Sequence, residues 1–206
     1  MSSVAYIPSH YAETDRSRLM DFIRARTFGT FVAILNGEAV VAHAPVALGE
    51  GVLRFHLAKG NAFLDAARTG TLAKAVFQGP DAYISPDWYV SENQVPTWNY
   101  VAVYAAGPLR TLSREEMIAQ VDALSAEQEA RLAPKKPWTR AKMAPRLDER
   151  MFAAIEGIEL KIDTLEGKFK LSQNKSAADI EGAAGALDKL KEPAGVSIAQ
   201  MMRNRT

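Results

Sequence analysis

Hydrophobic runs separated by turn residues fill the first third of the chain. Three of them are rich in β-branched and aromatic residues, at 28–35, 39–48 and 52–58. Asn36-Gly37 separates the first two runs, and this pair indicates a hairpin because a type I′ turn requires positive φ at both central residues. The runs are too close together for crossover helices, so we predict antiparallel pairing.

The same pattern continues further along the chain. Strand-like runs recur at 71–79, 82–85 and 98–107. Near the C-terminal third, Ile158, Leu160 and Ile162 alternate with polar residues, which predicts one half-buried strand.

Helical spacing appears between and after these runs. The clearest case is a helix from Ser113 to about Arg131, because Ser113 and Glu116 form a capping-box pattern. A first helix is expected to begin at Thr14, with Leu19 and Ile23 on its buried face. Further helices are predicted at 61–68, near 147–155 and in the Ala-rich tail from Ser176.

These elements predict an α+β fold built around a small, mostly antiparallel barrel or sandwich. The length of 206 residues fits one domain. We therefore expect a single domain over residues 1–206, with a helical insertion at about 113–155 and a helical tail at about 176–206.

Composition narrows the range of partners. The chain has 25 basic and 24 acidic side chains, which gives no overall electrostatic case for nucleic acid or an anionic membrane. Cysteine is absent, which excludes disulfides and thiolate chemistry. No apolar run approaches the ~20 residues of a membrane span, and the N-terminal residues lack a signal-peptide pattern. We expect a cytoplasmic protein.

Familiar phosphate and nucleophile motifs are missing from the sequence, including a Walker A loop and a G-x-S-x-G elbow. "FHLAKGN" (55–61) offers an alternative, because Lys59 ends a strand beside a helix that Asn61 can cap. This segment predicts one of two arrangements. Lys59 either binds a phosphate, or it is a solvated lysine beside an ordinary helix cap formed by Asn61. His43 and His56 lie in neighbouring runs and suit a polar network or pocket wall better than a metal site.

Two later segments carry donors and aromatic groups. In "VPTWNYVAV" (95–103), alternation places Trp98 and Asn99 on opposite faces, and a tryptophan and an amide can bind a planar heterocycle. The commoner role of a strand tryptophan is in the core, and we favour it for Trp98. "GKFKLSQNKS" (167–176) gathers lysines, amides and hydroxyls, of which Ser176 is explained as a helix cap. The basic connection around Trp138 suits a solvated loop or nucleic-acid contact.

Together these motifs resemble a known family. "YIPSHYAETD", "FHLAKGN", "AVFQGPDAYISPDWY", "VPTWNYVAV", "GIELKI" and "LEGKFKLSQNKS" are similar, in this order, to the PaiB-type family of FMN-binding negative transcriptional regulators. That family is related to split β-barrel flavoproteins such as pyridoxamine phosphate oxidase and flavin reductases. The resemblance implies a split barrel that forms a homodimer with FMN in a groove between the subunits.

The resemblance also implies roles for individual residues. Lys59 would hold the flavin phosphate, and Gln78 would bond the isoalloxazine edge or support the pocket. Phe55 and Gly60 depart from the family pattern, and a Phe55 ring in the groove would narrow it. The cofactor-binding set implied is His43, His56, Leu57, Lys59, Asn61, Gln78, Thr97, Trp98, Asn99, Lys170, Ser172, Gln173 and Asn174.

Several functions fit these expectations. The first is FMN binding with a regulatory role, although the sequence has no convincing helix-turn-helix and no basic domain for direct DNA binding. A second is a flavin-dependent oxidoreductase or flavin-reductase-like enzyme, since the flavin carries its own chemistry. A third is a split barrel that binds haem through a histidine. We identify no catalytic residue and no metal ligand.

Overall fold

A computed structural model describes residues 5–204 of the chain. These residues form two compact units. Unit 1 combines the N-terminal segment through Phe22, the central segment Gln78–Val103 and the C-terminal segment from Glu166. Unit 2 combines Ile23–Phe77 and Tyr104–Leu165.

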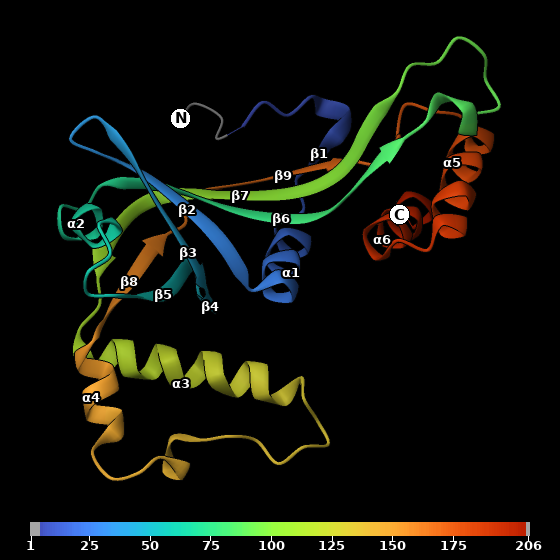
Figure 1. Ribbon diagram of the computed structural model, residues 1–206. Helices are drawn as coiled ribbons and strands as arrows, with labels where there is room; N and C mark the ends of the chain where they lie inside the picture. The colour runs from blue at the N-terminus through green and yellow to red at the C-terminus, as the bar shows by residue number, and fades with distance from the viewer. Residues whose placement is uncertain (1–4, 205–206) are drawn as a thin grey trace. The chain divides into compact units, whose positions relative to one another are not determined.

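Unit 2 is built on an antiparallel sheet (Figure 1). Along the sheet the strands follow the order β3-β2-β6-β7-β8-β5-β4. Strands β6 and β7 are the long ones, and each also runs into unit 1. Every strand pair with a described register in this unit is antiparallel, as the short connections predict. The strands are β2 (Phe28–Leu35), β3 (Glu38–Pro45), β4 (Ala47–Gly49), β5 (Val52–Ala58), β6 (Leu72–Ile84), β7 (Thr97–Thr111) and β8 (Ile155–Lys161).

The predicted hairpin between β2 and β3 is confirmed. Asn36 and Gly37 have φ values of 52° and 85°, and the turn sets Leu35 opposite Glu38. The runs at 71–79 and 82–85 were expected as separate strands, and this is wrong because β6 continues through both.

The strand expected around Ile158 is confirmed as β8, and a further strand, β9 (Thr164–Lys170), follows it. Its half-buried character is wrong, because Glu159, on the face expected to be exposed, is 7% exposed. The carboxylate of Glu159 accepts hydrogen bonds at 2.7 Å from the guanidinium groups of both Arg54 and Arg110. Burial alone would raise the pKa of Glu159, but these bonds lower it overall. A carboxylate tolerates burial when it is paired in this way.

Four phenylalanine rings form the centre of unit 2. The rings of Phe31 and Phe55 are stacked with centroids 4.0 Å apart. Phe77 from β6 and Phe63 from helix α2 (Phe63–Arg68) pack edge-on against Phe31, at 6.5 and 6.3 Å. Phe55 is fully buried. Its ring therefore belongs to the core, and it does not narrow a surface groove.

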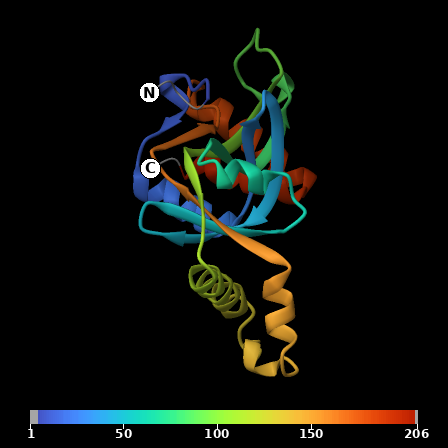
Figure 2. The same cartoon turned by 90° about the vertical axis from the view of Figure 1, so that its left-hand side faces the viewer.

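Two helices cover one end of the unit 2 sheet, and Figure 2 shows α3 (Arg114–Ala130) end-on beside α4 (Leu147–Ala153). The predicted capping box is confirmed, because the Ser113 hydroxyl accepts from the Glu116 backbone N–H and the Glu116 carboxylate accepts from that of Ser113. Part of the basic connection after α3 is neutralised locally. The Arg140 guanidinium forms two 2.7 Å bonds with the Asp122 carboxylate, and the Lys135 ammonium pairs with Glu129.

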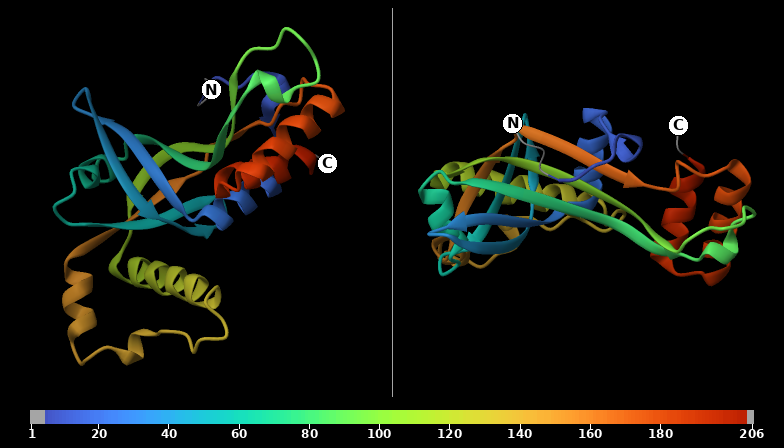
Figure 3. Two further views of the ribbon diagram at one scale, coloured as in Figure 1. Left: turned by 45° about the vertical axis from the view of Figure 1, so that its right-hand side comes forward. Right: turned by 90° about the horizontal axis from the view of Figure 1, so that it is seen from above.

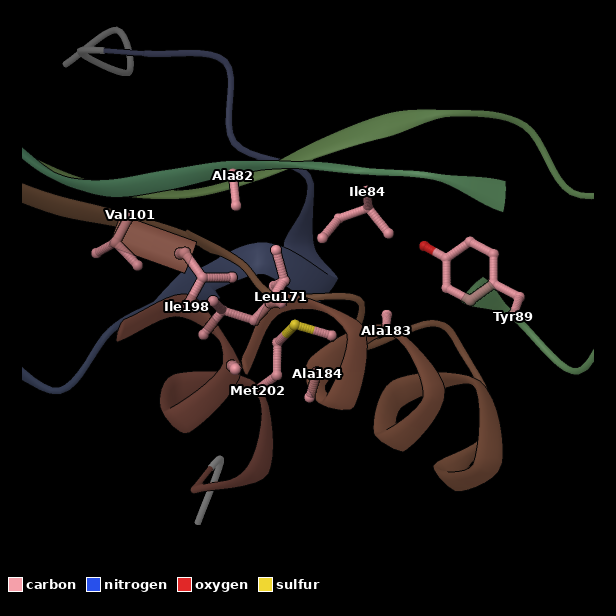
Figure 4. Close-up of a cluster of buried hydrophobic side chains, with 11 residues drawn as sticks. Ala82, Ile84, Tyr89, Val101, Leu171, Ala183, Ala184, Ile198 and Met202 are labelled. Carbon is pink, nitrogen blue, oxygen red and sulfur yellow. The ribbon is translucent and has the colours of Figure 1, made fainter. Parts of the chain in front are cut away.

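Unit 1 packs two C-terminal helices, α5 (Ala177–Leu190) and α6 (Pro193–Arg203), which lie side by side (Figure 3). Their apolar faces meet residues of β6, β7 and the segment after β9. Figure 4 shows this buried cluster, in which Ile198 and Met202 of α6 approach Val101 and Leu171. The predicted helical tail is confirmed.

The N-terminal part of unit 1 holds a short strand and the start of a helix. Strand β1 (Ala12–Glu13) pairs antiparallel with β9. Helix α1 (Arg16–Arg26) begins later than expected, because the Asp15 carboxylate, and not the Thr14 hydroxyl, accepts from the backbone N–H of Ser17 at 2.8 Å. Within residues 5–204, no helix is long and apolar enough to cross a membrane.

Asp179 gives unit 1 a pH-dependent stability. Its buried carboxylate accepts from the backbone N–H groups of Ser91 and Val90 and from the Ser91 hydroxyl, each at 2.8 Å. These bonds, led by those from Ser91, lower the pKa of Asp179 from 3.8 to about 2. A depressed pKa contributes stability above the unfolded value, and this contribution is lost as the pH falls from 3.8 to about 2.

We therefore expect Asp179→Asn to lower the melting temperature by several degrees at neutral pH. The difference between wild type and the variant should shrink as the pH falls below 4, in thermal melts followed by circular dichroism. A difference that is constant across this range would contradict the assignment.

Candidate functional site

A pocket of about 370 Å³ in unit 2 contains Lys59, the residue that the sequence marks as a phosphate ligand. Its volume falls in the ~300–1,000 Å³ range of small-molecule sites. Buried Met117 of α3 and Phe152 of α4 give the pocket an apolar part. Its other lining residues are Arg68, Thr111, Leu112, Ser113, Arg114, Ile155, Glu156 and Gly157.

Of the three cationic side chains that line this pocket, one is paired with carboxylates and two are not. The Arg68 guanidinium is paired with the carboxylates of Asp65 and Glu156, at 2.7 and 2.8 Å. Within residues 5–204, by contrast, no carboxylate lies within ion-pair distance of the side chains of Lys59 or Arg114. The pocket therefore has spare positive charge, and an anionic group beside an apolar surface suits it.

The strand end that carries Lys59 is fixed by the backbone. The Lys59 N–H donates to the Ala154 carbonyl at 3.0 Å, which ties the end of β5 to the end of α4. The Asn61 side chain accepts from the Phe63 N–H at 2.9 Å, although the N-cap of α2 is Ala62, one residue later than predicted. Leu57 is buried at 6% exposure and belongs to the core.

The two histidines of the predicted set lie in different surroundings. His56 Nδ1 lies 3.1 Å from the side-chain oxygen of Gln120, a buried residue one turn along α3 from Met117. The other end of that amide, Gln120 Nε2, is buried with no partner. His43 is exposed on β3 and its ring lies parallel to that of Phe28, with centroids 6.5 Å apart. Among the described residues, no group of three His, Asp or Glu side chains could hold a metal ion.

A second pocket lies in unit 1 and measures about 130 Å³. It collects several members of the sequence-predicted set, namely Thr97, Asn99, Lys170, Ser172 and Asn174. Asn99 and Ser172 are buried and bonded to each other, with Asn99 Nδ2 donating to the Ser172 hydroxyl at 2.9 Å. The Lys170 ammonium donates to the Thr97 hydroxyl.

Two of the predicted residues in unit 1 have local roles. The Gln173 side chain closes the turn after β9, because its oxygen accepts from the Leu171 N–H at 2.7 Å and its amide donates to the Phe169 carbonyl. Gln78 is exposed on β6, and its amide lies 3.4 Å from the Asp81 carboxylate.

The core role that we favoured for Trp98 is wrong. Trp98 is 53% exposed, while Asn99 on the opposite face of β7 is fully buried. The alternation was predicted correctly, but the amide and not the indole faces the interior. The Trp98 ring instead packs edge-on against exposed Tyr83, with centroids 6.0 Å apart.

We expect Trp98→Ala to cost about 1 kcal/mol of stability or less, since one exposed aromatic pair is lost. A buried tryptophan would cost ~3–5 kcal/mol. Urea denaturation followed by circular dichroism distinguishes the two values, and a loss in the upper range would contradict the exposed position.

Sequence reasoning missed several residues of the two pockets. Arg114 could have been noticed as the residue directly after the helix cap Ser113, just beyond the end of β7 at Thr111. Tyr11, Tyr89 and Lys175 line the second pocket from segments far apart in the chain. No sequence signal connects these three.

Comparison with known proteins places the chain in a family. Residues 5–164 match the family model described as "Putative FMN-binding domain". The chain is 28% identical to the "Protease synthase and sporulation protein PAI 2" of Bacillus subtilis, over 97% of each chain. It is also 28% identical to an uncharacterized protein of Emericella nidulans, again over 97% of each chain.

Solved structures share the fold at low sequence identity. The "FAD and Heme binding protein" of Mycobacterium smegmatis matches with a TM-score of 0.60 and 19% identity, covering 82% of this chain and 78% of that one. A conserved hypothetical protein of Mycobacterium tuberculosis matches with a TM-score of 0.61 and 10% identity, covering 84% and 94%. The predicted α+β split-barrel fold is confirmed.

Proposed function

Because the chain belongs to the PaiB-type family, whose shared module is an FMN-binding domain, we propose that it binds FMN with the phosphate held by Lys59 and Arg114. The further parts of the proposal are a homodimer with the flavin at the subunit interface, a cytoplasmic location and a role as a negative transcriptional regulator.

One observation carries the phosphate assignment. Lys59 and Arg114 border the same pocket, and among the described residues neither lies within ion-pair distance of a carboxylate. Two such cations near one phosphate add charge-assisted hydrogen bonds of ~1.5–3 kcal/mol each. The apolar side chains of Met117 and Phe152 beside them suit the less polar part of the ligand.

When bound, the flavin would supply redox chemistry, and the chain needs only to position it. His56 is the residue of this region best placed to stay in one orientation, because Gln120 fixes its ring at Nδ1. Gln120 Nε2 is buried and makes no hydrogen bond. The structure supports these as positioning groups, with no proton transfer assigned to either.

The direct test is an absorption spectrum of the full-length protein after incubation with FMN and removal of the excess by gel filtration. We expect a retained flavin spectrum with FMN and much weaker retention with riboflavin, which lacks the phosphate. Equal retention of both would overturn the phosphate assignment, and retention of neither would overturn FMN binding.

An exposed apolar face of unit 2 supports the homodimer. Phe28, Ile34, Val41 and Leu72 are 57%, 57%, 50% and 70% exposed, and they lie on the neighbouring strands β2, β3 and β6. Such a face is unusual on a protein that stays monomeric. His43 pairs with Thr30 on the same two strands, which would bring it close to a partner subunit.

We expect Val41→Lys to shift the protein towards the monomer and to weaken FMN retention with it, because the site is then incomplete. Sedimentation velocity measures the first effect and the flavin spectrum the second. A dimeric variant would contradict this face as the interface, whereas a monomer with full flavin retention would contradict the interface position of the site.

The regulatory role and an enzymatic role need separate tests. Salt-dependent binding to duplex DNA, with affinity falling as salt rises, would support direct regulation. The second candidate is a flavin-dependent oxidoreductase, since a bound flavin carries its own redox chemistry. It predicts bleaching of the bound flavin by NADH or NADPH, and an unchanged spectrum would count against it.

A further inference from the structure

The pocket of unit 1 has more positive charge than its surroundings neutralise. Lys170 and Lys175 both line it, and both are half-buried. Their ammonium groups donate to neutral oxygens, those of Thr97 and Gln94. In the described part of the chain, neither lysine lies within ion-pair distance of a carboxylate. A partly buried cation without a counter-ion is unfavourable unless a ligand supplies one.

The acidic residue Asp179 forms no ion pair with either lysine. It follows Lys175 by four residues in the sequence, and its carboxylate accepts hydrogen bonds from Val90 and Ser91. Tyrosine rings surround the lysines instead, with Lys170 Nζ 5.9 Å from the centroid of Tyr11 and Lys175 Nζ 5.0 Å from that of Tyr89.

A buried hydroxyl in the same pocket has no partner. Tyr89 lines the pocket and is 8% exposed, and its hydroxyl makes no hydrogen bond. Figure 4 shows the Tyr89 side chain with its hydroxyl directed from its loop toward the buried cluster that includes Ile84. Unpartnered buried polar groups are rare and call for an explanation. A second phenol, that of Tyr11, has a pKa raised by burial and by Tyr89, so it stays protonated as a donor at neutral pH.

We infer that this pocket binds an oxyanion group the size of phosphate, held by the ammonium groups of Lys170 and Lys175 and the hydroxyl of Tyr89. Its volume of about 130 Å³ accommodates such a terminal group but falls below the ~300 Å³ of sites for whole drug-sized molecules. Asn99 and Ser172 form its buried wall and are held by their mutual hydrogen bond. The inference rests on unit 1 alone and does not depend on the FMN proposal for Lys59.

The test is calorimetric titration of the full-length, flavin-free protein with inorganic phosphate at constant ionic strength. The titration is made in the Lys59→Ala background, so that the other proposed phosphate site does not contribute. There we expect one bound phosphate whose affinity falls at least tenfold on adding Lys170→Gln and severalfold on adding Tyr89→Phe. Tyr89→Phe is the sharper variant, because it removes a hydroxyl without a partner and should leave the melting temperature of the unliganded protein unchanged or raised. Lys189→Gln, on an exposed residue of α5, is the matched control with unchanged affinity.

Phosphate affinity that is the same in Lys59→Ala alone and with Lys170→Gln or Tyr89→Phe added would overturn the inference, as would no binding beyond the effect of ionic strength.

Two further titrations identify the source of the oxyanion. If FMN loading abolishes phosphate binding and Lys170→Gln weakens FMN but not riboflavin, the group is the phosphate of the flavin. If phosphate still binds one-to-one to the FMN-loaded protein, the pocket takes a separate phosphorylated ligand. The Lys59→Ala variant should bind inorganic phosphate normally in this pocket, which separates this outcome from the FMN proposal.

Discussion

Replacing Lys59 by alanine is expected to weaken FMN binding about 10- to 100-fold, the equivalent of one lost charge-assisted contact to phosphate. The reason is that the Lys59 ammonium lies in the pocket without a carboxylate partner, so its charge is available to the ligand. The effect should disappear when riboflavin replaces FMN. Fluorescence titration of each flavin against wild type and variant measures both affinities.

The melting temperature of the flavin-free Lys59→Ala variant shows whether weaker FMN binding comes from a lost ligand contact or from a damaged fold. Lys59 is exposed, and within residues 5–204 its side chain forms no hydrogen bond or ion pair, so the melting temperature without flavin should barely change. Arg114→Ala should give a similar FMN-specific loss, and the double variant a larger one. Lys161→Ala, on an exposed lysine paired with Asp163, is the control that keeps wild-type affinity. Equal FMN affinity in wild type and Lys59→Ala would contradict the assignment.

Phe55→Ala is expected to have the largest effect on stability, a loss of about 3–5 kcal/mol in the free energy of unfolding. Phe55 is fully buried, its ring stacks on Phe31 at 4.0 Å, and Phe63 lies 6.2 Å away. Removing it leaves a cavity that rigid strands cannot close. Urea denaturation followed by circular dichroism gives the value, and Phe55→Leu should recover most of the loss.

Comparing Phe55→Ala with Trp98→Ala shows whether the loss of stability follows from the burial of the side chain and not from its size. Trp98 is a large aromatic on the exposed face of β7 and should lose about 1 kcal/mol or less. A small loss in Phe55→Ala with tighter FMN binding would mean that the ring obstructs a groove, contrary to its place in the core.

Much of the fold is predictable because its signals are local. The turn at Asn36-Gly37 and the capping box of Ser113 and Glu116 both involve residues within four positions of each other. Their geometry depends on backbone preferences and short hydrogen bonds that the sequence states directly. The errors occur where a distant partner changes the pattern, as at Glu159, whose burial depends on Arg54 and Arg110.

The candidate site was predictable in part for the same reason. Lys59 stands out as a candidate because a strand end, a turn and a helix cap follow one another in the chain. Trp98 was misassigned because alternation separates two faces without saying which of them is inside. Arg114 and Tyr89 were missed because their neighbours in space come from other segments.

The sequence by itself therefore determined the antiparallel α+β architecture, the hairpin and helix starts, and the lysine-rich segment from Lys168 to Lys175. Backbone conformation and side-chain alternation are properties of adjacent residues, and they are sufficient for these features. Only the tertiary structure decided that Phe55 is core and Trp98 is exposed. It also decided that Lys59 shares a pocket with Arg114, and Lys170 one with Tyr89. These relations depend on which distant side chains exclude water from each other, and spacing along one chain does not encode that.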